Sequence, residues 1–379
     1  MGDRLKVVTV LGTRPEIIRL SRVMALLDEH VDHKLVHTGQ NSDHELNEVF
    51  FQDLKVRPPD YFLGISRSSL GRLLGEILIR CEEVFIAEKP DAVLILGDTN
   101  SAFAAVLARR MRIPVYHMEA GNRCFDFNVP EELNRRIVDH VSDFNLVYTE
   151  HARRNLLAEG VPARRIYLTG SPMKEVLDAN RDGIAGSAIL NELSLKPQQY
   201  FIVSMHRAEN VDVAENLTSL LDALSALCEC YGLPVIVSTH PRTRDKLEKL
   251  GHQGVHPLIQ FLKPFGFHDY IHLQQQSLCA LSDSGTISEE SAILGFPAIT
   301  LRNAIERPEA MDSGHIIVTG LDQRVILDSV RLAVATQELT RQHPIPAEYA
   351  ISNTSHRVVK LILGTAKLSH RWDGIVVPT

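Results

Sequence analysis

The sequence contains few of the features that build disulfide frameworks, metal centres or membrane spans. Its 379 residues include five cysteines, an odd number, and no two of them have CxxC spacing. Reduced thiols in a cytoplasmic protein are therefore the simplest interpretation. The 17 histidines form no HExxH motif and no cysteine–histidine cluster, so we expect no metal. No apolar run approaches the roughly 20 residues that a membrane helix requires.

The chain also lacks an excess of positive charge. Its formal net charge is -7 at pH 7, which gives no general electrostatic reason to bind nucleic acid or an anionic membrane. The N-terminal residues lead directly into a strand pattern without the apolar segment of a signal peptide, which favours a cytoplasmic location. The turn after this first strand is LGTRPE rather than GxGxxG, so no dinucleotide cofactor is indicated, and we expect no cofactor.

What the sequence does contain is a regular alternation of short apolar runs and helical patterns. Near-continuously apolar strands that alternate with helices predict parallel sheets covered on both faces. Residues 16–30 illustrate the helical pattern, since their apolar side chains recur at close to a 3.6-residue period. Strands are expected near residues 6–11, 34–38, 92–96, 115–118, 144–148 and 166–169, and again near 200–204, 234–238, 259–262, 279–282, 298–301 and 316–319.

The length and the repeated scheme predict an α/β protein with two Rossmann-like doubly wound domains. A chain of 379 residues is too long for one ordinary core. We expect a first domain at 1–172, a linker at 173–197, a second domain at 198–350, and a C-terminal helix and tail at 351–379 that cross back to the first domain. Ligands of such sheets bind outside the carboxyl ends of the strands, and an anion-binding cleft between the domains is predicted.

In the first half, charged residues cluster where strands end. Arg14 follows the first strand at a helix start, where it could bind an anion, although a solvated arginine in an ordinary turn is the alternative. Asp98 and Glu119 follow neighbouring strands and predict a pair of carboxylates suited to acid and base roles. Asp98 could instead cap the next helix. Glu131 and Arg135 lie four residues apart on one helical face, where a surface helix start is the alternative.

Two histidines occupy equivalent positions in the second half. His206 follows the first strand of that half, and His240 follows the next strand along the chain. A lone histidine is usually structural, but two at equivalent strand ends favour a ligand site in the second domain.

The strongest local pattern is LSDSGTISEESAILGFPAITLRNAIERPEA. Ser284, Gly285 and Thr286 lead into a helix and offer amides and hydroxyls to a diphosphate. One turn into that helix, Glu289 or Glu290 could bind a ribose diol. A capped helix would explain Ser284 but not the whole run, which also places Glu306 and Arg307 after the next strand.

The motifs GTRPE, GDT, EAG, PEELNR, HRAEN, DSG and ERPE, in this order, resemble the non-hydrolysing UDP-N-acetylglucosamine 2-epimerase family. The resemblance spans nearly the whole chain. It implies a GT-B fold with a deep interdomain cleft, UDP held mainly by the second domain, and a homodimer. It also implies inversion at C2 of a UDP-activated N-acetylated sugar without NAD or metal, by elimination of UDP and its re-addition to a 2-acetamidoglycal.

The resemblance also implies roles for individual residues. Asp98, Glu119, Glu131 and His206 are expected to be catalytic, with the three acids handling protons and the histidine near the leaving diphosphate. The residues expected to bind the substrate or its UDP are Arg14, Arg19, Arg135, His240, Tyr270, Ser284, Gly285, Thr286, Glu290 and Arg307.

Departures from the common family pattern indicate a branch. Arg19 stands where lysine is common, DSGT replaces DSGG, and the loop between Glu119 and Glu131 is shorter. This set resembles the branch that makes UDP-N-acetyl-L-fucosamine from UDP-2-acetamido-2,6-dideoxy-L-talose for surface polysaccharide. The alternatives are a UDP-N-acetylglucosamine 2-epimerase, a glycosyltransferase with an acceptor site, and a non-catalytic nucleotide-sugar-binding protein. Gln40 falls in a segment that the family associates with regulation by a second UDP-sugar, but Asp43 and His44 depart from that pattern.

Overall fold

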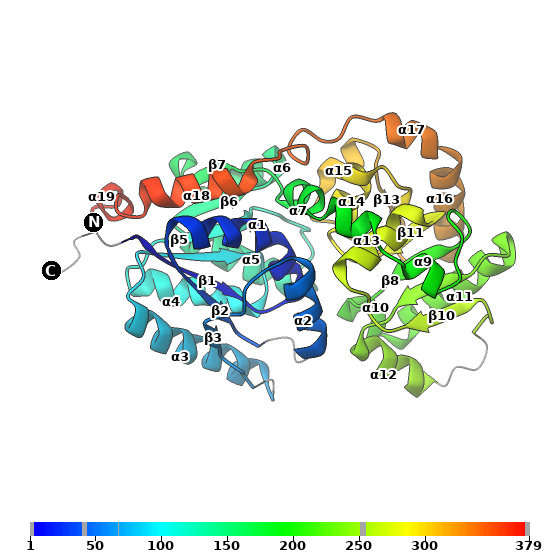
Figure 1. The fold of residues 1–379 in the computed structure, drawn as a ribbon, viewed down its shortest axis with the longest axis horizontal. Helices are drawn as coiled ribbons and strands as arrows, with labels where there is room; N and C mark the ends of the chain where they lie inside the picture. Colours follow the sequence, from blue (N-terminus) through cyan, green and yellow to red (C-terminus); the bar gives the residue numbers. More distant parts are fainter. Residues whose placement is uncertain (1–3, 40–43, 67, 251–254, 376–379) are drawn as a thin grey trace. The chain divides into compact units, whose positions relative to one another are not determined.

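The computed structural model describes residues 4–39, 44–66, 68–250 and 255–375. The chain divides into two compact units, one made of Met1–Ala179 with Glu348–Thr379 and the other of Asn180–Ala347 (Figure 1). The first break falls inside the linker expected at 173–197. The segment after Glu348 groups with the first unit, and its helix α18 (Thr354–Thr365) packs against α1 (Arg14–His30).

The first unit is built on a parallel sheet of seven strands in the order β3-β2-β1-β4-β5-β6-β7. Every residue of β4, β5 and β6 is buried, as expected for strands covered on both faces. The sequence predicts no strand at β3, which has only two residues and an exposed Phe62. The strands are β1 (Lys6–Leu11), β2 (Asp32–His37), β3 (Tyr61–Phe62), β4 (Ala92–Leu96), β5 (Val115–Ala120), β6 (Phe144–Val147) and β7 (Ile166–Leu168).

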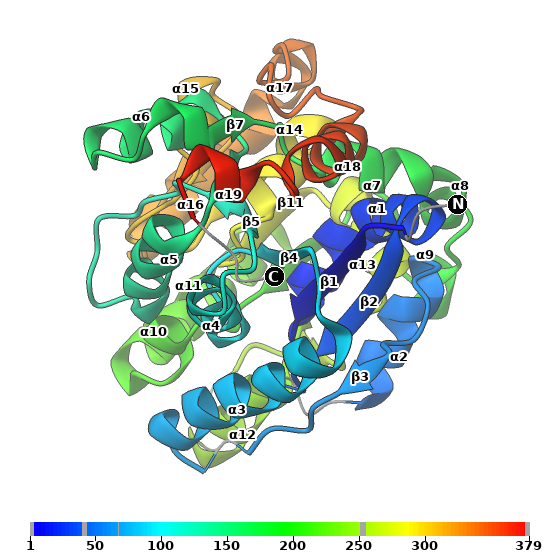
Figure 2. The same ribbon diagram turned by 90° about the vertical axis from the view of Figure 1, so that its left-hand side faces the viewer.

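Helices cover both faces of this sheet. Packing among α1, α7 and α18 defines one layer, and packing among α3, α4 and α5 defines the other, with the strands between them (Figure 2). Pro15 in the first turn of α1 suits a helix start, and Ser69 caps α3 by accepting a hydrogen bond from the amide of Arg72. The other helices are α2 (His44–Asp53), α3 (Leu70–Glu88), η1 (Asn100–Phe103), α4 (Ala104–Arg110), α5 (Pro130–Val141), α6 (Glu150–Ala158), η2 (Ala163–Arg165), α7 (Met173–Ala179) and α19 (Ser369–Trp372).

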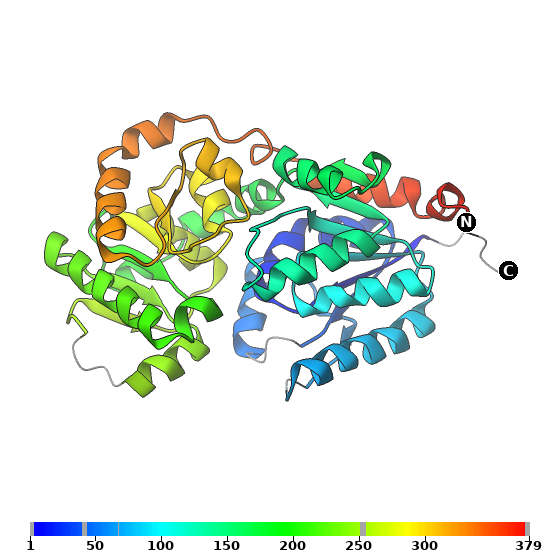
Figure 3. The ribbon, with the colours of Figure 1, turned by 180° about the vertical axis from the view of Figure 1, so that it is seen from behind.

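The second unit repeats the same topology with six parallel strands in the order β10-β9-β8-β11-β12-β13. Figure 3 shows the ribbon from behind, with the helices of this unit lying against its strands. The strands are β8 (Phe201–Ser204), β9 (Val235–Ser238), β10 (Ile259–Leu262), β11 (Cys279–Ser282), β12 (Ala298–Thr300) and β13 (Ile317–Val318). The helices are α8 (Arg181–Ala185), α9 (Ile189–Glu192), α10 (Ala208–Val211), α11 (Ala214–Tyr231), α12 (Pro241–Leu250), α13 (Phe267–Gln276), α14 (Ile287–Leu294), α15 (Pro308–Asp312), α16 (Gln323–Ala335) and α17 (Gln337–Gln342).

The strand order reverses between β1 and β4 in the first sheet and between β8 and β11 in the second. In open α/β sheets, ligands bind outside the carboxyl ends of the strands at these points. The predicted site residues lie at or after the ends of β1, β4 and β5 in the first unit, and after β8, β9, β10, β11 and β12 in the second. In the described ranges, no helix has both the length and the apolar character needed to cross a membrane.

Candidate active site

Glu119 lies inside β5, in a β-bulge, rather than after a strand that ends at Met118. The pairing of β5 with β6 shifts register between Met118 and Ala120, and Glu119 has a left-handed backbone with φ of 65°. A non-glycine residue in this conformation costs about 1–3 kcal/mol, which the surrounding structure must offset. Bulges turn a side chain away from its regular direction. A Cβ atom on Gly97 would lie 3.8 Å from Oε2 of Glu119, so the carboxylate lies beside the turn after β4.

Arg19 of α1 forms a buried ion pair with Glu119. Both residues are at most 8% exposed, and the Arg19 guanidinium lies 6.0 Å from the centre of the Tyr148 ring. Removing one partner of such a pair would leave an uncompensated buried charge. Arg19, which the sequence predicts as a substrate contact, is therefore also the residue that holds the bulged acid.

Asp98, in the turn after β4, is held by Arg135 of α5. Nε of Arg135 lies 3.0 Å from Oδ2 of Asp98, and its Nη2 binds the same oxygen. The side-chain amide of Asn134 donates to the carbonyl of Asp98 at 3.0 Å. The N-cap position of the following helix η1 belongs to Thr99, so the capping alternative for Asp98 does not hold. Through Asn134 and Arg135, the PEELNR motif on α5 therefore contacts the turn that follows β4.

Two adjacent glutamates on α5 have different surroundings. Glu132 is wholly buried and accepts hydrogen bonds from Arg135 at 2.9 Å, from Arg136 at 3.0 Å and from the amide of Cys124 at 3.0 Å. Glu131 is partly exposed. Sequence reasoning singled out Glu131 and missed Glu132, although the arginines three and four residues after Glu132 were a usable signal.

Glu16, in the first turn of α1, is a second residue that the sequence analysis did not predict as part of the site. Glu16 accepts hydrogen bonds from the amide of Gly12 at 3.0 Å, from Thr13 Oγ1 at 2.7 Å and from Thr99 Oγ1 at 3.1 Å. It therefore ties this turn to the one that carries Asp98. Burial raises the pKa of Glu16 to about 7, against the opposing effect of these hydrogen bonds.

Arg14 lies at the start of α1, partly exposed, with its guanidinium 5.7 Å from the centre of the Phe50 ring. Gln40 and Asp43, which bear on regulation, lie outside the described residues.

In the second unit, Asp283 organises the loop that carries His206. Asp283 is wholly buried directly after β11, and its Oδ1 lies 3.1 Å from Nδ1 of His206. Its carboxylate also accepts from the amides of His206 and Arg207, each at 3.0 Å, and from Nδ2 of Asn210 at 3.1 Å. Burial alone would raise the pKa of Asp283, but His206 and these hydrogen bonds lower it to about 2. The imidazole of His206 is thereby oriented while its side chain stays 43% exposed.

The DSGT segment then enters α14. The hydroxyls of Ser284 and Thr286 lie 3.0 Å apart. A Cβ atom on Gly285 would lie only 2.5 Å from Nη1 of Arg307, so glycine permits the close approach of this buried guanidinium. Nε of Arg307 lies 3.1 Å from Oε2 of Glu289, which is buried. The structure therefore brings Arg307 from the ERPE motif against the start of α14.

The remaining predicted residues of the second unit lie around the carboxyl ends of its strands. Glu290 accepts a hydrogen bond from Gln274 at 2.8 Å. Burial and the charge of Glu290 raise the pKa of Tyr270, although hydrogen bonds with Ser204 and Ser282 oppose the shift. These two serines end β8 and β11, which places Tyr270 at the point where the strand order reverses. His240 follows β9 and is partly buried.

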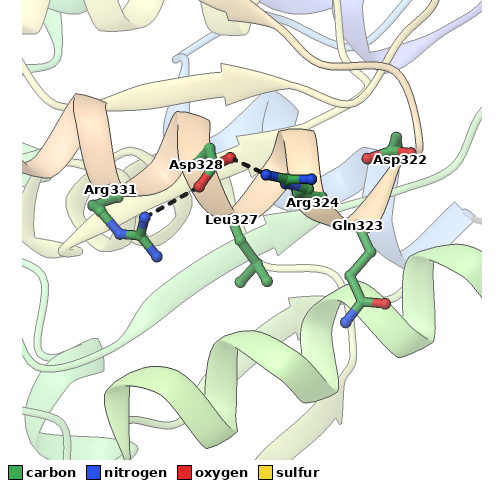
Figure 4. Close-up of a pocket in the computed structure, with 6 residues that line it drawn as sticks. All are labelled: Asp322, Gln323, Arg324, Leu327, Asp328 and Arg331. Atoms are coloured by element: carbon green, nitrogen blue, oxygen red, sulfur yellow. Dashed lines mark hydrogen bonds and ion pairs between the residues drawn. The ribbon is translucent and has the colours of Figure 1, made fainter.

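Among the described residues, neither a cluster of metal ligands nor the surface hollow on α16 adds to the candidate site. No group of three or more histidine, cysteine, aspartate or glutamate side chains in these ranges could hold a metal ion. A surface hollow on α16 (Figure 4) contains none of the predicted site residues, and its Asp328 pairs with Arg331 at 3.1 Å. It is lined by Asp322, Gln323, Arg324, Leu327, Asp328 and Arg331.

The chain is similar to known proteins over most of its length. A family model described as UDP-N-acetylglucosamine 2-epimerase matches residues 25–363. The solved structure of UDP-N-acetylglucosamine 2-epimerase from Rickettsia bellii is 45% identical with a TM-score of 0.91, and the match covers 97% of this chain and 98% of that one.

Two further relatives carry information on ligands. The crystal structure of Methanocaldococcus jannaschii UDP-GlcNAc 2-epimerase in complex with UDP-GlcNAc and UDP is 33% identical, has a TM-score of 0.89, and covers 95% of this chain and 100% of that one. UDP-2,3-diacetamido-2,3-dideoxy-D-glucuronate 2-epimerase from Pseudomonas aeruginosa is 35% identical over 87% of this chain and 92% of its own length. The expected fold, two parallel-sheet α/β domains of the GT-B type, is confirmed.

Proposed function

Because the chain belongs to the UDP-N-acetylglucosamine 2-epimerase family, we propose that it converts UDP-2-acetamido-2,6-dideoxy-L-talose to UDP-N-acetyl-L-fucosamine. The chain is an isomerase of the non-hydrolysing kind, and its family epimerises UDP-sugars at C2. The choice of sugar, the roles of individual residues and the course of the reaction belong to this proposal. The observation that carries the site assignment is the placement of Asp98 and Glu119 at neighbouring strand ends, each held by an arginine from a different helix.

The chemistry explains why acids and a diphosphate site are both needed. The C2 hydrogen is not next to a carbonyl, so its acidity is low. Early cleavage of the bond between C1 and the diphosphate oxygen builds positive charge on the sugar, and this charge eases loss of the C2 proton. The electron pair of the broken C2–H bond then forms the C1–C2 double bond of a 2-acetamidoglycal. Re-addition of UDP at C1, with protonation of the other face of C2, completes the inversion.

In this scheme the first unit handles protons. Asp98, Glu119 and Glu131 take and return the C2 proton, a contribution that is typically 100- to 10,000-fold for a positioned acid or base. The arginines Arg19 and Arg135 hold two of these carboxylates in place, so a variant of either arginine would misplace an acid. Contacts of both arginines and of Arg14 with the substrate are part of the same proposal.

The second unit binds UDP. The amides and hydroxyls of Ser284, Gly285 and Thr286 and the guanidinium of Arg307 suit the diphosphate. His206, oriented by Asp283, stabilises the charge that develops on the leaving diphosphate. The remaining UDP contacts proposed are His240, Tyr270 and Glu290, with the glutamate assigned to the ribose.

The loop Asn122–Val129 supports the choice of a 6-deoxy sugar. Phe125 and Phe127 are 68% and 71% exposed, and the Arg136 guanidinium lies 6.0 Å and 5.4 Å from their ring centres. Exposed aromatic rings at this loop offer an apolar contact to a C6 methyl group, which a 6-hydroxyl sugar lacks. The Pseudomonas aeruginosa relative, named for a different UDP-sugar, supports the view that related chains differ in their sugar.

A UDP-N-acetylglucosamine 2-epimerase is the second candidate, favoured by the name of the Rickettsia bellii relative and by the UDP-GlcNAc complex of the Methanocaldococcus jannaschii structure. Incubation with each UDP-sugar in deuterium oxide, followed by NMR at C2, separates the two. Deuterium incorporation into the L-talo or L-fuco sugar supports our proposal, and incorporation into UDP-N-acetylglucosamine alone overturns it. Binding without exchange in any sugar would instead indicate a non-catalytic nucleotide-sugar-binding protein.

We further propose that the protein is a cytoplasmic homodimer that supplies a sugar for surface polysaccharide. Light scattering after size exclusion tests the oligomeric state, and a mass of a single 42.4 kDa chain would contradict the dimer.

A further inference from the structure

We propose that His117 and Asp139 form a positioning pair that fixes the backbone on both sides of Glu119 and at the turn before Asp98. Neither residue contacts the reacting atoms in the scheme above. The inference rests on the proposed function in one respect, namely that Asp98 and Glu119 are the reacting acids.

His117 lies in β5, two residues before Glu119, and is wholly buried. Its Nε2 lies 2.8 Å from the carbonyl oxygen of Gly97, and its Nδ1 lies 2.9 Å from Oδ1 of Asp139. A carbonyl and a carboxylate are both acceptors, whereas a neutral imidazole has only one N–H group. Nε2 of His117 therefore donates the hydrogen bond to the Gly97 carbonyl, while Nδ1 faces the Asp139 carboxylate.

Asp139 of α5 binds the other side of the bulge. The amide of Gly121, two residues after Glu119, donates to Oδ2 of Asp139 at 3.1 Å. Nη1 of Arg123 lies 2.7 Å from the same oxygen. Burial alone would raise the pKa of Asp139, but His117 and Arg123 hold it below its usual range. One carboxylate thus links residues on both sides of the strained acid.

The backbone around the pair has little freedom to compensate for its loss. Gly97 and Gly121 both have left-handed backbones, with φ of 70° and 78°. A Cβ atom on Gly121 would lie 2.4 Å from the carbonyl oxygen of Ala152, so this turn packs directly on α6. The amide of Gly97 donates to the carbonyl of Met118 at 2.9 Å, which couples the turn after β4 to the bulge. A shift at His117 would therefore move both Asp98 and Glu119.

The sheet contains a matched control. His33 in β2 is also buried, with its Nδ1 2.6 Å from Asp28 and its Nε2 2.8 Å from Thr9 Oγ1. It lies near the start of its strand, at the amino end of the sheet, away from the turns that carry the acids. His33→Gln thus removes a comparable histidine–aspartate bond without touching the positioning pair.

The test compares steady-state kinetics of His117→Gln, His117→Asn, His117→Ala and His33→Gln with the sugar that the wild type exchanges fastest. Misplacing a reacting group by about 1 Å can cost roughly 100-fold in rate. We expect His117→Gln, which keeps a donor toward Gly97, to lower kcat at least about tenfold while KM changes less than about threefold. His117→Asn, which keeps a donor toward Asp139, should behave similarly, and His117→Ala should be the slowest. His33→Gln should keep kcat within about twofold of the wild-type value. Its loss of thermal stability should be similar to that of His117→Gln.

Two kinetic results would overturn the inference: an unchanged kcat in both His117→Gln and His117→Asn, or an equal fall in kcat in His33→Gln. Hydrogen exchange measured by mass spectrometry needs no substrate, and it reports how firmly the backbone next to the pair is held. Amides of residues 115–125 should exchange faster in His117→Gln than in His33→Gln, and equal exchange would also overturn the inference. Asp98→Asn is assayed in parallel, because undiminished turnover in that variant would refute the reacting role proposed for Asp98 while leaving the exchange result interpretable.

Discussion

Arg19 and Glu119, one hundred positions apart in the sequence, form a buried ion pair at the carboxyl end of the first sheet. The pair joins the first helix of the chain to the bulge in β5. It explains how a carboxylate can occupy a strained, nearly enclosed position, because the guanidinium compensates its charge.

Arg19→Ala should therefore harm both stability and activity. Breaking a buried ion pair by removing one partner typically costs about 3–5 kcal/mol in the free energy of unfolding. Arg19→Lys should retain most of the stability, since it keeps the positive charge. Urea unfolding and turnover assays on both variants check this, and an Arg19→Ala protein as stable as the wild type would contradict the role of the pair.

Substitutions of the two adjacent glutamates of α5 should affect different properties, the activity in one case and the stability in the other. Glu131→Gln should lower kcat by about 100-fold or more with little change in thermal stability, because Glu131 is a partly exposed acid proposed to react. Glu132→Gln should lower the free energy of unfolding by about 1–3 kcal/mol, because the buried carboxylate of Glu132 accepts hydrogen bonds from Arg135, Arg136 and the Cys124 amide. Thermal unfolding and steady-state kinetics distinguish them, and the opposite pattern would move the catalytic assignment to Glu132.

Gly285→Ala should weaken UDP binding. The new methyl group would meet Nη1 of Arg307 at 2.5 Å and push the guanidinium away from the start of α14. We expect the Kd for UDP, measured by calorimetry, to rise at least about tenfold, which corresponds to 1.4 kcal/mol. Gly75→Ala in α3 is the control, because no atom lies within 4 Å of its added Cβ. Equal UDP affinity in the two variants would argue against a diphosphate site at Gly285.

The lowered pKa of Asp283 predicts that the protein loses stability in acid. Its pKa is lowered from 3.8 to about 2 in the folded protein, so its stabilising contribution is present above the unfolded value. That contribution is lost as the pH falls from about 4 through about 2, and it amounts to roughly 2 kcal/mol. Asp283→Asn should be less stable than the wild type at pH 6, and the gap should narrow toward pH 3. Urea midpoints across this range measure the effect, and a constant gap would contradict it.

Much of the fold follows from local pattern. The apolar runs predict every strand except β3, with ends that shift by one or two residues, because buried parallel strands must be apolar along their whole length. The strand β3 was missed because two residues carry no periodicity. The positions of Asp98, His206 and Ser284 after strands followed from the same pattern together with the rule for ligand sites.

The sequence by itself determined the family, the two α/β domains and the set of acids and glycines near strand ends, because these depend on residue order and local spacing. Only the tertiary structure decided that Glu119 lies in a bulge, that Arg19 and Arg135 hold the acids, and that the carboxylates of Glu132 and Asp139 are buried. Those facts depend on contacts between residues distant in the chain and on which side chains lose water. No local pattern encodes either of these quantities.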